Sequence, residues 1–213
     1  MQSVRTGLAT TSAVRRTVRL LNEHRITTCG TAMLVMCSGG VDSVVLAHLM
    51  RALPRGSQPS TIGLLWLDHG LRDTTGDEHA VTDLAAALGV ELHSVRCAPG
   101  ELALQARRDV SGVQGAARTW RYHVAETIAR AHGYSMIVTG HTADDQIETA
   151  LHRMLSSSGS HGLAGMRVAR PLGGAQLVRP LLTTTRDEVV AVAEEAGLAW
   201  VEDPSNIDTR FRR

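Results

Sequence analysis

The stretch MLVMCSGGVDSVVLAHLM, residues 33–50, decides how the fold of this chain is interpreted. Its apolar first part leads through a Ser-Gly-Gly turn into a second apolar stretch that begins with Asp42 and Ser43. A short apolar run before a glycine turn is typical of a buried strand, and capping-type residues after the turn are typical of a helix start. The two glycines, Gly39 and Gly40, allow successive backbone N–H groups to converge on an anion. We therefore predict a strand, a phosphate-binding loop and a helix, in that order.

The residues around this turn also exclude the two commonest nucleotide loops. The stretch lacks the Lys of GxxxxGK and the spaced glycines of GxGxxG. An ordinary glycine-rich turn capped by Asp42 is the alternative. A carboxylate repels phosphate, so Asp42 suits a phosphate site only if a divalent cation bridges the two. We expect Asp42 to be a metal ligand.

The pattern of an apolar strand followed by a helix is repeated further along the chain. Apolar runs typical of buried strands occupy residues 61–67, 90–95 and 135–140, and an edge strand is expected within residues 175–182. Stretches with a helical period lie between and after them. This order predicts an α/β fold: a doubly wound, mainly parallel five-stranded sheet with helices on both faces.

Composition sets limits on the class of protein. With 213 residues and 43% hydrophobic content, the chain is expected to form a single domain over residues 1–213. A net charge of +1 does not indicate a polyanion partner, and 3% aromatic residues argue against RNA binding by base stacking. The three cysteines form no CxxC, which favours a reducing, cytoplasmic setting. No run is long enough for a membrane span, and we find no signal-peptide pattern.

SGGVDS after an apolar strand resembles the pyrophosphate loop of the N-type ATP pyrophosphatases. The resemblance implies an adenine nucleotide alpha hydrolase-like, Rossmann-like fold that cleaves ATP between its α and β phosphates and transfers AMP to a substrate oxygen. It implies ATP and Mg²⁺ as cofactors. The ATP-binding residues that we expect are Ser38, Gly39, Gly40, Val41, Asp42, Ser43, His69, Gly140 and His141.

Three further segments are similar to the tRNA(Ile)-lysidine synthetases within that superfamily: LDHGLR at 67–72, ARTWRY at 117–122 and TGHTADDQIETALHRML at 139–155. The likeness runs from residue 34 to residue 213. It departs from the family at Gln114, where Glu is usual, and at residues 156–159, where an Arg-Gly-Ser-Gly loop is usual.

Two of these segments carry clusters of charge. Arg118 and Arg121 lie three residues apart on one helix face and can present two guanidinium groups to phosphate, although a solvated basic face is the plain alternative. Asp144, Asp145 and Glu148 fall close together at a helix start, where capping alone is the alternative to a cation site. The resemblance implies Asp42, Arg118, Arg121 and Asp145 as catalytic residues, Asp145 and Glu148 as lysine ligands, and Asp42 and Asp145 as metal ligands.

The family reaction joins lysine to the wobble cytidine of the tRNA(Ile) with a CAU anticodon, through an adenylated base. L-lysine and this tRNA are therefore the expected partners, with no membrane partner, and a homodimer is left open. Arginines expected to contact tRNA are Arg72, Arg179, Arg186, Arg210, Arg212 and Arg213. The family's C-terminal tRNA-binding domains are expected to be absent from this chain. The alternatives are a related RNA thiolation enzyme and a catalytically incomplete ATP-binding module.

Overall fold

A six-stranded sheet forms the centre of the computed structural model, which describes residues 12–70, 74–106, 112–156 and 165–202. Strands β1 (Ala32–Met36), β2 (Thr61–Asp68), β3 (Glu91–Arg96), β4 (Met136–Val138), β5 (Ala169–Leu172) and β6 (Ala175–Val178) stand in the order β3-β2-β1-β4-β6-β5. All neighbours are parallel except β5 and β6. The prediction of a mainly parallel α/β sheet is confirmed.

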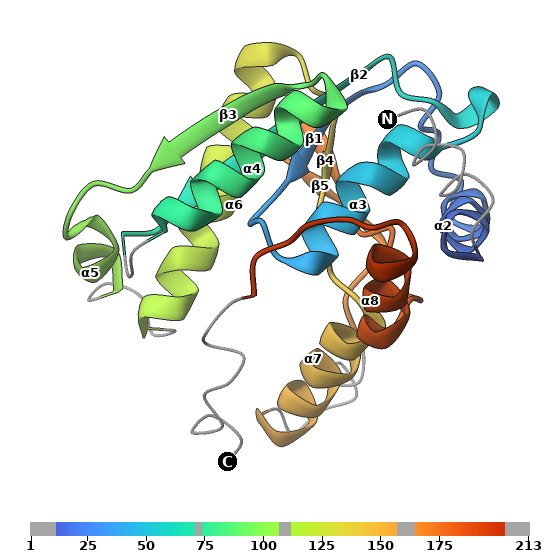
Figure 1. Ribbon diagram of the computed structural model, residues 1–213. Coiled ribbons are helices and arrows are strands. Elements are labelled where there is room, and N and C mark those ends of the chain that lie inside the picture. The colour runs from blue at the N-terminus through green and yellow to red at the C-terminus, as the bar shows by residue number, and fades with distance from the viewer. Residues whose placement is uncertain (1–11, 71–73, 107–111, 157–164, 203–213) are drawn as a thin grey trace.

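Helices cover both faces of the sheet (Figure 1). They are α2 (Ser12–Glu23), α3 (Val41–Ala52), α4 (Thr75–Leu88), α5 (Glu101–Ala106), α6 (Gly112–His132), α7 (Ala143–Ser156) and α8 (Arg186–Glu195), with a 3₁₀ turn at Arg55–Ser57. The larger apolar core joins one face of the sheet to α2, α3, α4 and α8. The smaller core joins the other face to α6. None of the helices in these described ranges is long and apolar enough to cross a bilayer.

The sheet has one strand more than the sequence predicted. Residues 169–172, Ala-Arg-Pro-Leu, pair antiparallel with β6 and form the outer strand. Pro171 removes a hydrogen-bond donor, which an edge strand tolerates, and Arg170 breaks the apolar pattern, so no local pattern predicts a strand here. The strand expected within residues 175–182 ends at Val178 and lies inside the sheet, between β4 and β5.

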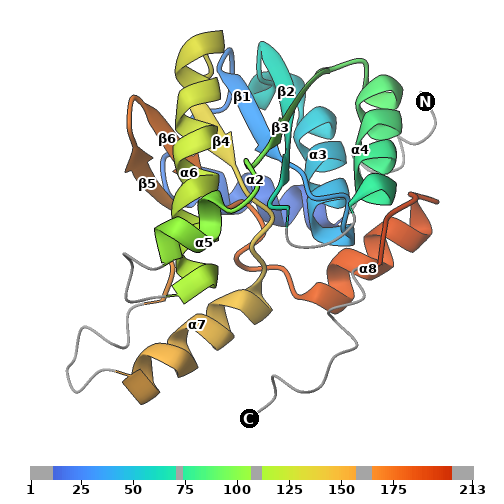
Figure 2. The same ribbon diagram turned by 90° about the vertical axis from the view of Figure 1, so that its left-hand side faces the viewer.

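The position of β1 in the sheet sets where a ligand can bind. The chain passes from β1 to β2 on one side and reaches β4 on the other, so the direction of winding reverses between β1 and β4. In open α/β sheets, ligands bind at the carboxyl ends of the strands at such a reversal. The loop after β1 and the turn after β4 both lie there, near α7 and α8 at the lower end of the molecule in Figures 1 and 2.

Candidate active site

A cavity of about 600 Å³ lies at the carboxyl ends of β1, β2 and β4. Its lining comes from six places in the sequence: the loop after β1, the end of β2, the start of α4, one face of α6, the turn after β4 and the start of α7. Arg186 at the start of α8 and Val201 complete the wall. The fold therefore brings the sequence-predicted loop and the residues after β4 into one cavity.

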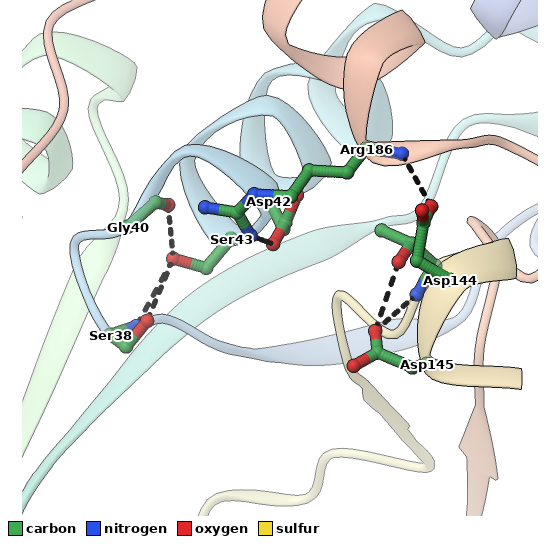
Figure 3. A network of polar contacts seen from close by, with 8 residues as sticks. Ser38, Gly40, Asp42, Ser43, Asp144, Asp145 and Arg186 are labelled. Atoms are coloured by element: carbon green, nitrogen blue, oxygen red, sulfur yellow. Dashed lines mark hydrogen bonds and ion pairs between the residues drawn. The ribbon is translucent and has the colours of Figure 1, made fainter. Parts of the chain in front are cut away.

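The loop after β1 is shaped by its own side chains (Figure 3). Gly39 has a φ of +88°, which favours glycine. The Ser43 hydroxyl donates to the Gly40 carbonyl at 2.9 Å and accepts the N–H of Ser38 at 3.2 Å. Within the described ranges, no backbone acceptor is found for the N–H groups of residues 40–42, whereas the N–H groups of Ser38 and Ser43 have acceptors and that of Gly39 points to the Cys37 sulfur. The N–H groups of residues 40–42, at the N-terminus of α3, are therefore available to an anion.

Asp42 holds its two carboxylate oxygens in different environments. Oδ2 accepts a hydrogen bond from the Arg186 guanidinium at 2.7 Å. Oδ1 is buried and has no hydrogen-bond partner in the described part of the chain. Burial raises the pKa of Asp42, and Asp145 and Asp144 add to that rise against the opposing effect of Arg186. A buried, unpartnered carboxylate oxygen is a group that a hard cation would satisfy, so these residues fit Mg²⁺.

Arg186 ties three parts of the site together. Its guanidinium reaches Asp42, and its backbone N–H donates to Oδ2 of Asp144 at 2.7 Å. Figure 3 shows Arg186 between the start of α3 and the start of α7. The sequence predicted a tRNA contact for Arg186, but the structure places it on the wall of the cavity, in an ion pair with Asp42.

Gly140 lets the turn after β4 come close to the loop after β1. A Cβ built at Gly140 would lie 3.2 Å from the backbone carbon and oxygen of Asp42, tighter than ordinary contact. Only a residue without a side chain fits at this distance without a backbone shift. The two loops that the sequence assigned to ATP therefore meet backbone to backbone.

Asp145 caps the helix that carries it. Its Oδ2 accepts the backbone N–H of Thr142 at 2.7 Å and the Thr142 hydroxyl at 3.0 Å. This is the capping role that the sequence left open as an alternative. Asp145 also lines the cavity, so its carboxylate stands within it while its Oδ2 fixes the start of α7.

Glu148 lies one turn further along α7. It is exposed and is not part of the cavity lining. Asp144 is also exposed and is held by the Arg186 backbone N–H. The three acids of the cluster therefore face different surroundings, and Asp145 alone contributes to the wall.

The two arginines of ARTWRY have different surroundings in the structure. Arg121 is half-buried in the cavity wall, with its guanidinium 3.4 Å from His69 Nε2. Arg118 is exposed, and its guanidinium carbon lies 5.2 Å from the centre of the Tyr122 ring; that of Arg170 lies 5.1 Å from the same ring. One guanidinium thus reaches the cavity directly, and the other stands near it.

Two histidines in the wall are kept uncharged near neutral pH. His141, whose Nδ1 lies 2.9 Å from the Thr139 hydroxyl, has a pKa lowered to about 4 by burial and by the nearby cation of Arg179. Burial also lowers the pKa of His69, and Arg121 lowers it further. Both imidazoles can serve as neutral hydrogen-bonding groups for a nucleotide.

Arg179 does not lie where the sequence predicted. It is 3% exposed, and its guanidinium donates to the carbonyl of Arg167 at 2.8 Å. Such burial disagrees with an RNA contact at the surface, because strand β6 leads the chain inward at this point. Arg72, Arg210, Arg212 and Arg213 lie outside the described residues.

Sequence reasoning missed two acids of the cavity wall. Asp68 at the end of β2 accepts the N–H of Gly70 at 2.8 Å, and Asp77 in the first turn of α4 is 6% exposed. Both line the cavity. Asp68 stands directly before His69 and could have been noticed, whereas an acid in a first helical turn is an ordinary capping residue and gave no signal.

Comparison with known proteins agrees with this site. A family profile described as a PP-loop domain matches residues 10–213. The chain is 43% identical over 181 residues to a tRNA(Ile)-lysidine synthase of Novosphingobium aromaticivorans, covering 83% of this chain and 52% of that protein. It is 39% identical over 210 residues to one of Salinispora arenicola, covering 95% and 58%. The chain thus spans little more than half the length of these two curated relatives.

Solved structures give the same fold at lower identity. A U34-tRNA thiolase of Methanococcus maripaludis matches with a TM-score of 0.72 and 17% identity over 90% of this chain and 65% of that one. An NH₃-dependent NAD synthetase of Campylobacter jejuni matches with a TM-score of 0.55 and 14% identity over 92% and 73%. At these identities the likeness concerns the fold alone.

Proposed function

Because the chain belongs to the PP-loop domain family, we propose that its cavity binds ATP and adenylates the wobble cytidine of tRNA(Ile), to which lysine is then joined. The observation that carries this proposal is the meeting, in one cavity, of the free N–H groups after β1, the unpartnered Asp42 oxygen and the Asp145 carboxylate. The substrate assignment rests on the relatives, which carry the name tRNA(Ile)-lysidine synthase.

The first step is attack of the cytidine 2-carbonyl oxygen on the α-phosphorus of ATP. The bond between the α-phosphorus and the bridging oxygen breaks, AMP is transferred to the base, and pyrophosphate leaves with that oxygen. N–H groups of residues 40–42 would stabilise the charge on the departing phosphates. Arg121, with Arg118 next to it, would neutralise the remaining negative charge.

A bound Mg²⁺ would supply charge neutralisation at the polyphosphate, and Asp42 and Asp145 are the residues that would hold it. Asp42 has an unpartnered oxygen for this purpose, and Asp145 stands in the same cavity. In the chain without ligand, Arg186 supplies positive charge to Asp42. Cation binding would compete with that ion pair.

The second step is displacement of AMP by the ε-amine of lysine at carbon 2 of the cytidine. Asp145 and Glu148 are the proposed partners of the lysine ammonium groups. Glu148 is exposed beside the cavity rather than in its wall, so it would bind a part of lysine that extends toward solvent. Holding the amine next to the activated carbon lowers the entropic barrier of the step.

A thiolation enzyme is disfavoured by the state of the cysteines. All three are free thiols, and Cys37 beside the loop is 3% exposed. Burial raises the pKa of the Cys37 thiol, which lowers the fraction of reactive thiolate.

The test is a single incubation of the chain with Mg²⁺, labelled ATP, labelled lysine and the tRNA(Ile) transcript with a CAU anticodon. We expect AMP, pyrophosphate and lysine-labelled RNA in equal amounts. A transcript with cytidine 34 replaced by uridine is the matched control and should yield none of them. ATP that binds without cleavage would support the incomplete module, and sulfur incorporation in place of lysine would support a thiolation enzyme.

The assignments that depend on the whole protein stay proposals. We propose that residues 1–213 act as one catalytic domain, that Arg186 serves the nucleotide rather than RNA, and that the reaction takes place in the cytoplasm. Tight tRNA binding would draw on segments of the relatives that this chain does not match, since it spans 58% of the Salinispora arenicola protein. Whether the chain works as a homodimer is tested by light scattering with and without tRNA.

A further inference from the structure

Three potential metal ligands meet at the end of the sheet opposite the cavity. They are Glu91 and His93 of β3 and His132 at the end of α6, and their ligand atoms all lie within 4.8 Å of one another. His93 Nε2 lies 3.8 Å from Glu91 Oε2, and His132 Nδ1 lies 3.9 Å from Glu91 Oε1. The carboxylate thus stands between two imidazole nitrogens.

The fold explains why these side chains converge. Glu91 and His93 are two residues apart on a strand, so both point to one face of the sheet. His93 is the register partner of Leu65, which belongs to the core beneath α6. Helix α6 covers this face and ends at His132, and Figure 2 shows its last turn at the end of the sheet away from α7.

Tyr134 is a fourth polar side chain next to this group. Its hydroxyl lies 3.1 Å from His93 Nε2. The ring reaches this position because Gly63 on β2 has no side chain: a Cβ there would lie 2.2 Å from the Tyr134 hydroxyl. The lack of a side chain at Gly63 therefore leaves room for the Tyr134 phenol. The contact with this phenol orients His93 Nε2 toward the space that Glu91 also faces.

The three donors differ in how freely they can move. The His93 side chain is 7% exposed, so its ring is held in place by the surrounding protein. The side chains of Glu91 and His132 are 59% and 40% exposed, so a cation has access and these two groups can move. Tetrahedral ligands about 2.1 Å from a metal lie about 3.4 Å apart, a small adjustment from the distances found.

We propose that Glu91, His93 and His132 form a second, distal metal site that binds one borderline divalent cation of the Zn²⁺ class. Two imidazoles and one carboxylate favour Zn²⁺, Co²⁺ or Ni²⁺ over Mg²⁺, which prefers oxygen ligands and keeps its water. The site is independent of the proposed nucleotide chemistry, because its residues lie at the starts of the strands and not at their carboxyl ends. Its occupancy would clamp the outer strand β3 to the junction between α6 and β4.

The test is titration of the metal-free chain with Co²⁺, followed by absorption, and with Zn²⁺, followed by competition against a chromophoric chelator. We expect one saturable equivalent and a rise of the melting temperature with Zn²⁺ that Glu91→Gln and His132→Ala lose. Glu91→Gln and His132→Ala, both at exposed positions, should each weaken Zn²⁺ binding by about tenfold or more.

Three variants serve as controls. His24→Ala removes an exposed histidine outside the site, Cys29→Ser removes the exposed thiol, and Asp42→Asn alters the nucleotide cavity. Each should keep the full equivalent of bound Zn²⁺. The proposal is overturned if no saturable equivalent binds, or if His132→Ala binds Zn²⁺ as tightly as the unaltered chain, or if the loss is equal in His24→Ala.

Discussion

The two carboxylate oxygens of Asp42 have different surroundings and can therefore have different roles. Its Oδ2 is paired with Arg186, whereas its Oδ1 is buried without a partner in the described residues. A buried unpaired carboxylate oxygen costs free energy, on the order of 1–3 kcal/mol for a hydrogen-bonding group. Because Asp42 lowers the stability of the fold in this way, ligand binding explains its position better than a contribution to stability does.

Replacing Asp42 by Asn tests this assignment. The change removes the charge with almost no change in volume, so the fold should persist while pyrophosphate release falls by on the order of 10²-fold or more. Release is measured at several Mg²⁺ concentrations, and folding by circular dichroism. Asp187→Asn, on the exposed side of α8, is the control and should leave release unchanged. Unaltered turnover in Asp42→Asn would rule out the metal assignment.

Replacing Glu148 by Gln tests lysine binding. The variant loses one charge-assisted hydrogen bond, worth about 1.5 kcal/mol, so the KM for lysine should rise by about tenfold while the KM for ATP changes little. Steady-state kinetics with each substrate varied in turn give both values. The exposed Glu194→Gln on α8 is the matched control. Equal shifts for lysine and ATP would argue against this role.

At the scale of elements, the site depends on how closely the starts of α3 and α7 approach each other. Gly140 brings the turn before α7 onto the backbone of Asp42, and Arg186 holds α8 to both helices. The helix starts are further fixed by local capping, through Asp145 in α7 and through Thr185 and Glu188 in α8. These contacts set the spacing of the N–H groups that we propose to bind phosphate.

Gly140→Ala should therefore separate the two helix starts. The added methyl group would lie 3.2 Å from the Asp42 backbone, so we expect a loss of about 1–3 kcal/mol in unfolding free energy and weaker ATP binding. Urea denaturation and calorimetric titration with ATP measure the two effects. Gly56→Ala has no atom within 4 Å of its new methyl group and serves as the control. Normal ATP affinity in Gly140→Ala would contradict the close-approach argument.

Thr185→Ala tests the cap of α8. The Thr185 hydroxyl accepts the Glu188 N–H at 3.3 Å, and the Glu188 carboxylate accepts the Thr185 N–H at 2.9 Å. Removing the hydroxyl should lower the unfolding free energy by about 1 kcal/mol. Thr185→Ser keeps the hydroxyl and should retain most of that stability in urea denaturation. A serine variant as unstable as the alanine variant would show that the cap contributes little.

For the whole molecule, burial of histidines links stability to pH. Burial lowers the pKa of His48, His69, His93 and His141, and for His141 it falls to about 4. Below a pH of about 6.5 the histidines of the unfolded chain bind protons that those of the folded chain do not. The contribution of these histidines to the unfolding free energy is therefore fully present above that pH. It is lost progressively as the pH falls toward 4.

We therefore expect the unfolding free energy to decrease between pH 6.5 and pH 4, and to decrease less in His141→Gln. Urea denaturation at half-unit pH intervals measures both curves. An NMR titration of the His141 ring should show no protonation between pH 7 and pH 5. A midpoint near pH 6.5 for that ring would contradict the burial argument.

Much of the fold could be predicted from the sequence because its signals are local. The strands β1 to β4 and helices α3, α4 and α6 follow apolar runs and helical periods, and Gly89 and Gly133 mark the ends of α4 and α6. Strand β5 carries Arg170 and Pro171 and is held only by pairing with β6, so no local pattern marks it. Short α5 gave no sequence signal that we noticed either, and it is held against α6 by Leu102.

The sequence by itself determined the backbone of the loop after β1, since Gly39 and Gly40 permit a tight turn between an apolar strand and a helix start. Only the tertiary structure decided which charged side chains meet there. It placed Arg186 on Asp42 across 144 positions of sequence, buried Arg179, and kept Arg121 but not Arg118 in the cavity wall. Backbone conformation depends on neighbours along the chain, whereas the partner and the burial of a charge depend on elements brought together from far apart in the sequence.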